Sequence, residues 1–247
     1  MEPHEAMNFK AENKTMLLDI LRSMDIMGSL KNNHRGKNAI EPYAIAHLLS
    51  SLAAEDELLS FPLQLVHKKP PDDKPDFLLS MEGKKIGIEH TDARPENETR
   101  KNVLRNRERI GPMVCFITPA KPGEPRRSVK ELRKEIEVND PGEGWGDQDG
   151  VDKEWAQVML WFIDEKENKL KKDFSRYNED WLLIRDAWPF PSVNPENATK
   201  YLFSQVMKRN IKLEFHRVFI ISSSNRGPVC EVAESGYHLR PRNDLWL

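Results

Sequence analysis

The sequence predicts an α/β fold in which a central mixed sheet is flanked by helices. Fully apolar runs at 181–184 and 218–221 have the composition of strands buried on both faces, and they alternate with helical periodicity at 154–172 and 198–208. Upstream, two apolar runs within 74–91 flank a break at Glu82-Gly83, which is the usual signal of a β-hairpin. Together these segments indicate a sheet covered by helices on both faces.

Composition narrows the class of protein. The 247 residues carry 38% hydrophobic and 32% charged residues, which is typical of a globular chain with a well-solvated surface. No apolar run approaches the length of a membrane span and the N-terminus has no signal-peptide pattern, so we expect a cytoplasmic protein without a membrane partner. The net charge of −2 means that any contact with nucleic acid must come from a local basic patch. Cys115 and Cys230 form neither a metal-binding pattern nor a disulfide framework.

Before the hairpin we expect two helices and one strand. Residues 1–30 contain an amphipathic helix whose apolar positions recur at three- and four-residue spacing from Met16 to Met27, with Gly28 able to end it. Its apolar face is expected to dock on the core, with self-association as the alternative. A second helix is predicted from about Asn38 to Leu59, and an edge strand over 61–67. With Asn38 as N-cap, Glu41 would be the partner residue of a capping box.

The hairpin holds two acids in unusual places. Asp76, after Pro75, opens its first strand and Glu89 closes its second. Because side chains alternate along a strand, Ile86, Ile88 and His90 share one face while Gly87, Glu89 and Thr91 share the other. Two carboxylates brought close by one hairpin could hold a divalent metal through hard oxygen ligands. Alternatively, Asp76 is a turn acid and Glu89 pairs with Arg94.

A charged helix is expected at 94–109, directly after the hairpin. Lys101, Arg105 and Arg109 recur every four residues and therefore line one stripe. Such a run is usually a solvated face balanced by nearby glutamates, but beside a metal site it could hold a phosphate backbone. A third buried strand is predicted over 113–118. Residues 119–153 are interpreted as an insertion, or mobile lobe, within one α/β domain spanning 31–247, and a basic helical piece is expected near 128–137.

Motif by motif, the chain resembles the PD-(D/E)XK, or restriction-endonuclease-like, nuclease superfamily. Pro75-Asp76 is followed, after twelve intervening residues, by Glu89. Upstream, Arg35-Gly36 and then Glu41 at the start of a helix resemble the first motif of Holliday-junction resolvases. Downstream, the spacing of Lys166, Lys169 and Tyr177 before the strand at 181–184 is similar to a segment of many members. The resemblance covers roughly 31–221.

The resemblance implies a Mg²⁺-dependent endonuclease that hydrolyses phosphodiester bonds, with DNA expected ahead of RNA, in genome defence, including antiviral defence, or repair. Asp76 and Glu89 would hold Mg²⁺, for which Mn²⁺ substitutes, with Glu41 beside them and the backbone carbonyl of His90 as a further ligand. A homodimer or a partner protein would help to deliver the nucleic acid. The residues expected to contact that nucleic acid are Arg35, Arg100, Lys101, Arg105 and Arg109.

One position departs from the family pattern. The third motif normally ends in a lysine two residues after the acid, and here that residue is Thr91. Lys101 and Lys166 are the candidates to replace that lysine in catalysis, and Lys101 is preferred because it is nearer in sequence. The alternative is a catalytically degenerate nuclease-fold protein that acts as a binding module for nucleic acid or protein.

Overall fold

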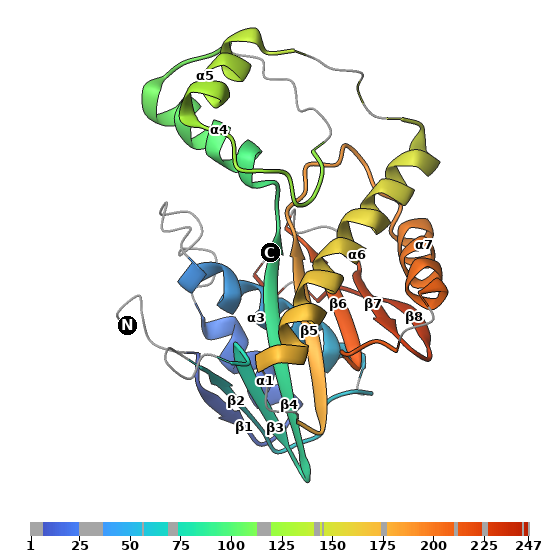
Figure 1. Ribbon diagram of the computed structural model, residues 1–247. Coiled ribbons are helices and arrows are strands. Elements are labelled where there is room, and N and C mark those ends of the chain that lie inside the picture. Colours follow the sequence, from blue (N-terminus) through green and yellow to red (C-terminus); the bar gives the residue numbers. More distant parts are fainter. Residues whose placement is uncertain are drawn as a thin grey trace.

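The computed structural model describes residues 7–24, 37–55, 57–68, 74–112, 120–140, 144, 146–173, 177–209, 212–223, 227–243 and 245–246. These residues build one eight-stranded mixed sheet with helices on both faces, which confirms the predicted α/β class (Figure 1). The strands lie in the sheet in their order along the chain. They are β1 (Phe9–Ala11), β2 (Leu63–His67), β3 (Phe77–Met81), β4 (Lys84–Ala93), β5 (Glu179–Asp186), β6 (Arg217–Ser222), β7 (Val229–Ala233) and β8 (Gly236–Arg240).

Only the middle of the sheet is parallel. β4, β5 and β6 pair in parallel, whereas all the other neighbours pair antiparallel. The described helices are α1 (Lys14–Ser23), α3 (Lys37–Glu55), α4 (Glu96–Glu108), α5 (Val129–Val138), α6 (Gln148–Asp173) and α7 (Pro195–Lys208). None of these helices combines the length and the apolar character that crossing a membrane requires.

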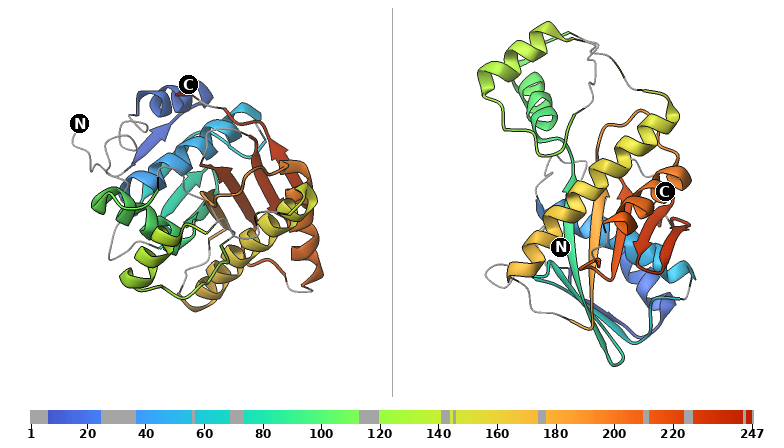
Figure 2. Two further views of the ribbon diagram at one scale, coloured as in Figure 1. Left: turned by 90° about the horizontal axis from the view of Figure 1, so that it is seen from above. Right: turned by 45° about the vertical axis from the view of Figure 1, so that its right-hand side comes forward.

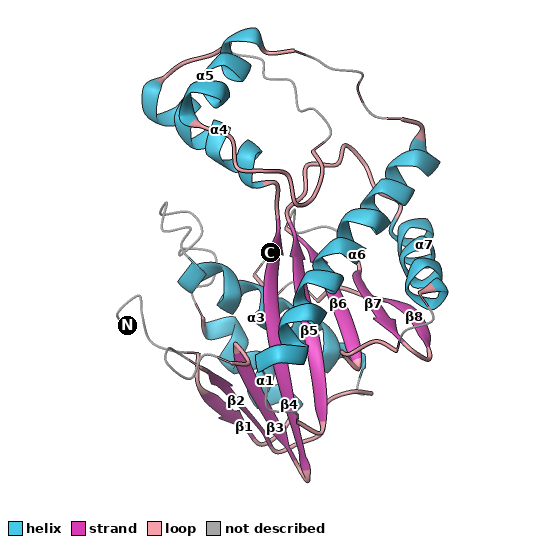
Figure 3. Cartoon of the chain, in the orientation of Figure 1, coloured by secondary structure: helices cyan, strands magenta, loops and turns pink. Residues whose placement is uncertain are grey.

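Two hydrophobic cores lie on opposite faces of the sheet. On one face α1 and α3 pack through residues such as Leu17 and Leu48 onto Ile88 and Leu183. On the other face α6 and α7 pack through residues such as Met159 onto the remaining side chains of β5 and β6. The view from above shows the sheet between these two helical layers (Figure 2), and the same layering is visible in the cartoon of Figure 3. The middle parts of β5 and β6, at 181–184 and 218–221, are apolar on both sides, as expected for strands covered by helices on both faces.

The N-terminal segment docks on the core, as its pattern predicts. Leu17 and Leu21 of α1 are fully buried in the core on the α3 side, and Asn13 caps the helix by accepting a hydrogen bond from the Met16 N–H. The helix ends at Ser23, and the predicted end at Gly28 lies outside the described residues. Before it, the short strand β1 pairs with β2. The prediction that 61–67 forms an edge strand is therefore wrong, because β1 occupies the outer side of β2.

Two further boundaries differ from the sequence-based expectation. α3 begins at Lys37, which places Asn38 inside the helix and not at its N-cap. α3 ends at Glu55, before the expected Leu59. The strand predicted over 113–118 lies outside the described residues.

The expected insertion forms a small helical lobe (Figure 1, top). Leu104 of α4 packs with Leu132 and Ile136 of α5 in a separate apolar cluster. Ser128 and Glu131 form a capping box at the start of α5. The lobe therefore includes the charged helix α4 and starts before the predicted boundary near 119. At its other end, α6 already begins at Gln148 and belongs to the sheet layer.

Gly87 allows the side chains of Tyr177 and Pro75 to lie close to the backbone of β4. A Cβ at this position would lie 2.7 Å from Cδ2 of Tyr177 and 3.1 Å from Cγ of Pro75. We expect Gly87→Ala to lower the free energy of unfolding by about 1–3 kcal/mol, because the added methyl group forces the Tyr177 ring to move in a packed environment. Gly146→Ala is the matched control, since a Cβ there meets nothing within 4 Å. Urea denaturation of both variants checks this, and equal stabilities would contradict the tight packing of Tyr177 on β4.

Candidate active site

The candidate site lies where β4 extends beyond the end of its pairing with β3. We call this place, with Asp76, Glu89 and His90, the notch. β3 pairs with β4 only from Lys84 to Ile88, whereas β5 pairs with β4 as far as Ala93. From Glu89 onward, β4 therefore has no β3 partner on that side. Asp76, just before β3, lies beside this free edge, and its Oδ2 accepts a hydrogen bond of 2.7 Å from the backbone N–H of His90. The short first strand and the long second strand thus bring Asp76 next to Glu89 and His90.

Glu89 meets a lysine from the helix that covers its face of the sheet. The Glu89 side chain is buried, and its Oε2 lies 2.9 Å from Nζ of Lys166 on α6. Its other oxygen, Oε1, is also buried and has no hydrogen-bond partner among the described residues. A buried carboxylate oxygen without a partner loses its hydration without a compensating hydrogen bond, so it needs an ordered water, an ion or a ligand as its partner.

The acids of the notch act on one another electrostatically. The pKa of Asp76 is raised from 3.8 to about 6, chiefly by burial and then by the neighbouring Glu89 carboxylate, with a smaller contribution from Glu41. The Lys166 ammonium and the His90 N–H oppose this rise. Two carboxylates that compete for one desolvated space, with a cation beside them, are typical of functional sites.

This perturbation predicts how stability depends on pH when no metal is present. Because the folded-state pKa of Asp76 lies above its ordinary value, its contribution is fully present below pH 3.8 and is lost as the pH rises through about 6. The loss amounts to roughly 2–3 kcal/mol for a shift of this size. We expect Asp76→Asn to flatten this part of the stability profile, measured by denaturation in EDTA between pH 4 and pH 7. Glu82→Gln, in the exposed hairpin turn, is the control, and identical profiles for wild type and Asp76→Asn would contradict the assignment.

Glu41 approaches the notch from α3. Its side chain is buried, and its Oε2 lies 3.1 Å from Nε2 of His67, at the end of β2, whose ring stacks on Phe77. Glu41 is thus near enough to influence Asp76 but is held by a histidine. In the described part of the chain, no three His, Cys, Asp or Glu side chains are grouped so that they could hold a metal ion together. The roles of Glu41 and of the His90 carbonyl as ligands therefore stay predictions.

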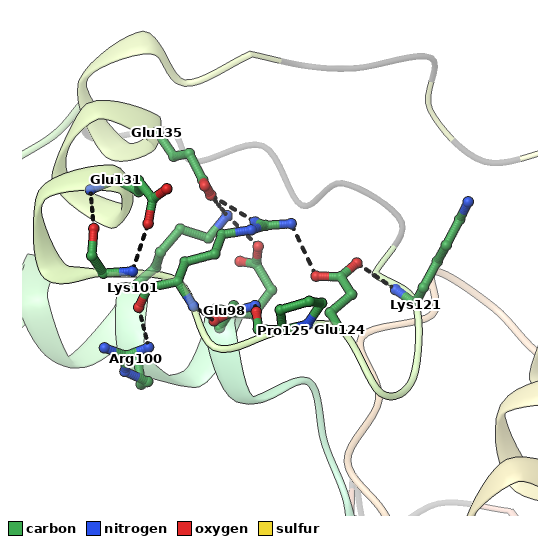
Figure 4. A network of polar contacts seen from close by, with 11 residues as sticks. Glu98, Arg100, Lys101, Lys121, Glu124, Pro125, Glu131 and Glu135 are labelled. Atoms are coloured by element: carbon green, nitrogen blue, oxygen red, sulfur yellow. Dashed lines mark hydrogen bonds and ion pairs between the residues drawn. The ribbon is translucent and has the colours of Figure 1, made fainter.

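Lys101, the lysine preferred from sequence distance, lies elsewhere. It is buried in the lobe, where its ammonium pairs with Glu98 of the same helix and, at 3.3 Å, with Glu135 of α5 (Figure 4). The helix that follows β4 leaves the sheet and carries Lys101 with it. The lysine that the structure brings to Glu89 is Lys166, so the preference for Lys101 is corrected.

The predicted basic stripe is not one continuous cationic surface. Lys101 is buried, and Arg100 donates a 2.6 Å hydrogen bond to the backbone carbonyl of Arg127. Arg105 contacts Asn102 at 3.1 Å, while Arg109, at the left-handed C-cap of α4, is exposed. Arg35 lies outside the described residues. The contact of these residues with nucleic acid stays a prediction, and Arg109 is the member that remains freely accessible.

A second lysine near the notch was not predicted. Lys68 directly follows β2, and its backbone N–H donates to the Asp76 carbonyl at 2.9 Å. Its Nζ lies 3.3 Å from the hydroxyl of Tyr177 and 3.3 Å from the carbonyl of Lys74. Tyr177 in turn packs on Gly87, two residues before Glu89. The only sequence signal was a lysine pair in a loop, Lys68-Lys69, which by itself is indistinguishable from ordinary surface charge.

Comparison of the chain with protein-family models, with curated proteins and with solved structures finds no match. The function must therefore be argued from the residues of the notch.

Proposed function

We propose that this protein is a Mg²⁺-dependent endonuclease that hydrolyses phosphodiester bonds, with DNA as the expected substrate, and that it is a member of the PD-(D/E)XK superfamily. The observation that carries the proposal is the convergence of two acids and one lysine in the notch. Asp76 lies beside the residue after Glu89, and Glu89 contacts Lys166. Its setting in genome defence or repair, and delivery of the DNA through a homodimer or a partner protein, belong to the same proposal.

The donor atoms of the notch suit a hard divalent cation. Asp76 and Glu89 would hold Mg²⁺, which prefers carboxylate oxygens and takes one or two from a protein. The unpartnered Oε1 of Glu89 and the raised pKa of Asp76 both support this, because a divalent cation would satisfy the first and favour ionisation of the second. When bound, Mg²⁺ supplies a water of lowered pKa and neutralises charge on the phosphate as its P–O bond breaks.

Lys166 offers an account of the departure at Thr91. Its ammonium reaches Glu89 from α6, so the site has a cation although the strand position two residues after the acid has none. There Lys166 would orient the attacking water and stabilise the negative charge that develops on the phosphoryl oxygens. Lys68, whose backbone N–H donates to the Asp76 carbonyl, would hold a neighbouring phosphate of the nucleic-acid backbone.

A substrate panel tests the proposal. Supercoiled duplex, linear duplex and single-stranded DNA, and RNA, are incubated with the protein in Mg²⁺, in Mn²⁺ or in EDTA, beside Asp76→Ala and Glu89→Ala. We expect cleavage of a DNA substrate that requires metal and is lost in both variants. Cleavage that persists in EDTA or in either variant would contradict the proposed site.

The second candidate function is a binding module with a degenerate site. Thr91, and the ion pair in which Glu89 is already neutralised by Lys166, favour it. Thermal stability separates the two functions, because an ion that binds only the folded state raises its stability in proportion to site occupancy. A midpoint raised by millimolar Mg²⁺ or Mn²⁺, and not in Glu89→Ala, supports the nuclease. The absence of both metal stabilisation and cleavage would favour the binding module.

A further inference from the structure

A cavity lies away from the notch, at the carboxyl ends of β5 and β6. It has a volume of about 380 Å³, and its lining includes the last residue of β5, residues from β6, β7 and α6, and the first residue of α7. In α/β sheets, ligands characteristically bind at the carboxyl ends of parallel strands. Here the position also adjoins the change from parallel pairing at β5–β6 to antiparallel pairing at β6–β7.

One carboxylate dominates the charge of this cavity. Asp186 accepts a hydrogen bond of 2.8 Å from Nε1 of Trp155 and one of 3.0 Å from the backbone N–H of Trp188. Burial raises the pKa of Asp186 to about 6, which leaves the group mainly ionised at pH 7. None of the described residues that line the cavity is basic. Arg185, the preceding residue, attracts the Asp186 carboxylate only in part, because its side chain lies on the other face of β5 and pairs with Asp92 at 2.7 Å.

Aromatic side chains make up much of the remaining wall. Trp155, Trp188 and Phe190 line the cavity, together with the apolar Val193 and Ile220. Trp188 is only 7% exposed, and its buried indole nitrogen has no hydrogen-bond partner among the described residues. A donor buried in this way is costly unless a water or a ligand supplies an acceptor.

We infer that this cavity binds a small organic cation, namely an amine with a flat apolar body. Its ammonium would pair with Asp186, and its flat body would lie against the aromatic side chains. The π faces of these side chains would also attract the ammonium. A hydroxyl or carbonyl oxygen on the ligand would accept a hydrogen bond from the indole N–H of Trp188. An anionic ligand finds no cation among the described lining residues, so a phosphate-bearing compound is disfavoured.

Tyramine is a suitable probe, because it combines an ammonium group, an aromatic ring and a hydroxyl. Its matched compounds are 4-ethylphenol, which is neutral, and 4-hydroxyphenylacetate, which is anionic. We expect tyramine to quench tryptophan fluorescence saturably at pH 7.5 and to bind about tenfold or more tightly than either analogue, as a single ionic contact in a sheltered site allows. The measurement uses no nucleic acid and no metal, so it is independent of the proposed nuclease function.

Three variants locate the binding. Asp186→Asn should reduce the affinity for tyramine to that for 4-ethylphenol, whereas Glu234→Gln, an exposed acid in the β7–β8 turn, should leave it unchanged. The asparagine amide of Asp186→Asn accepts poorly from both the Trp155 and Trp188 N–H groups, so this variant could also disturb the local structure. Val193→Trp provides a second test, because it fills the cavity and keeps Asp186. It should abolish binding of all three compounds. Equal affinities for tyramine and 4-ethylphenol, no saturable binding at millimolar tyramine, or unchanged binding in Asp186→Asn would each overturn the inference.

Discussion

Lys166→Met is expected to slow metal-dependent cleavage of DNA by about 10²–10³-fold, the usual cost of removing one preorganised charge from a reacting centre. Methionine retains the length and apolar stem of lysine, and the Lys166 side chain is partly exposed, so the fold should persist. The rate is measured under single-turnover conditions with saturating Mg²⁺. Lys169→Met, an exposed lysine less than one turn further along α6, is the matched control and should cleave at the wild-type rate.

Lys101→Met tests the lysine that distance along the sequence favoured. Lys101 pairs with Glu98 and Glu135 inside the lobe, so its loss should reduce stability and change the chemical rate by no more than a few-fold. Loss of cleavage in Lys101→Met together with normal cleavage in Lys166→Met would refute the assignment of Lys166.

Asp76→Asn and Glu89→Gln are each expected to reduce cleavage by about 10³-fold or more, because metal-ion stabilisation of a phosphoryl-transfer transition state is worth several kcal/mol. Both substitutions preserve shape and remove the charge that holds the ion. The same variants should also lose the rise in thermal midpoint that Mg²⁺ produces in the wild-type protein.

Glu82→Gln is the control for both acids. Glu82 lies in the exposed turn of the same hairpin, so the variant should retain cleavage and metal stabilisation. If Asp76→Asn or Glu89→Gln cleaved as fast as Glu82→Gln, the two acids would have no part in catalysis.

The hairpin could be predicted because its signals are local. Alternation along the strand places Ile86 and Ile88 on the α3 side and Glu89 on the other, and the Gly-centred turn fixes the register of the two strands. The same local reasoning placed the buried strands β5 and β6. It missed β1, which has three residues, and also β7 and β8. β1 is too short to show a period.

Lys166 could be named as a candidate from the sequence, but local patterns could not rank it above Lys101. Lys166 is 77 residues from Glu89 in the sequence, and the two meet only because α6 packs across the face of β4 and β5. Distance along the chain favoured Lys101, but α4 leaves the sheet and buries Lys101 against α5. The start of α3 was also predicted wrongly. Asn38 has the residue type of an N-cap, but α3 begins one residue earlier, at Lys37.

Binding of Mn²⁺ measured by electron paramagnetic resonance tests the central claim most directly, because it needs neither the right substrate nor an activating partner. The wild-type protein and Glu82→Gln should bind Mn²⁺, and Mg²⁺ should compete with it. Asp76→Asn and Glu89→Gln should bind it at least tenfold more weakly, as expected when one of two charged ligands is lost. Equal binding by all four proteins, or none by the wild type at millimolar Mn²⁺, would contradict a metal site at Asp76 and Glu89.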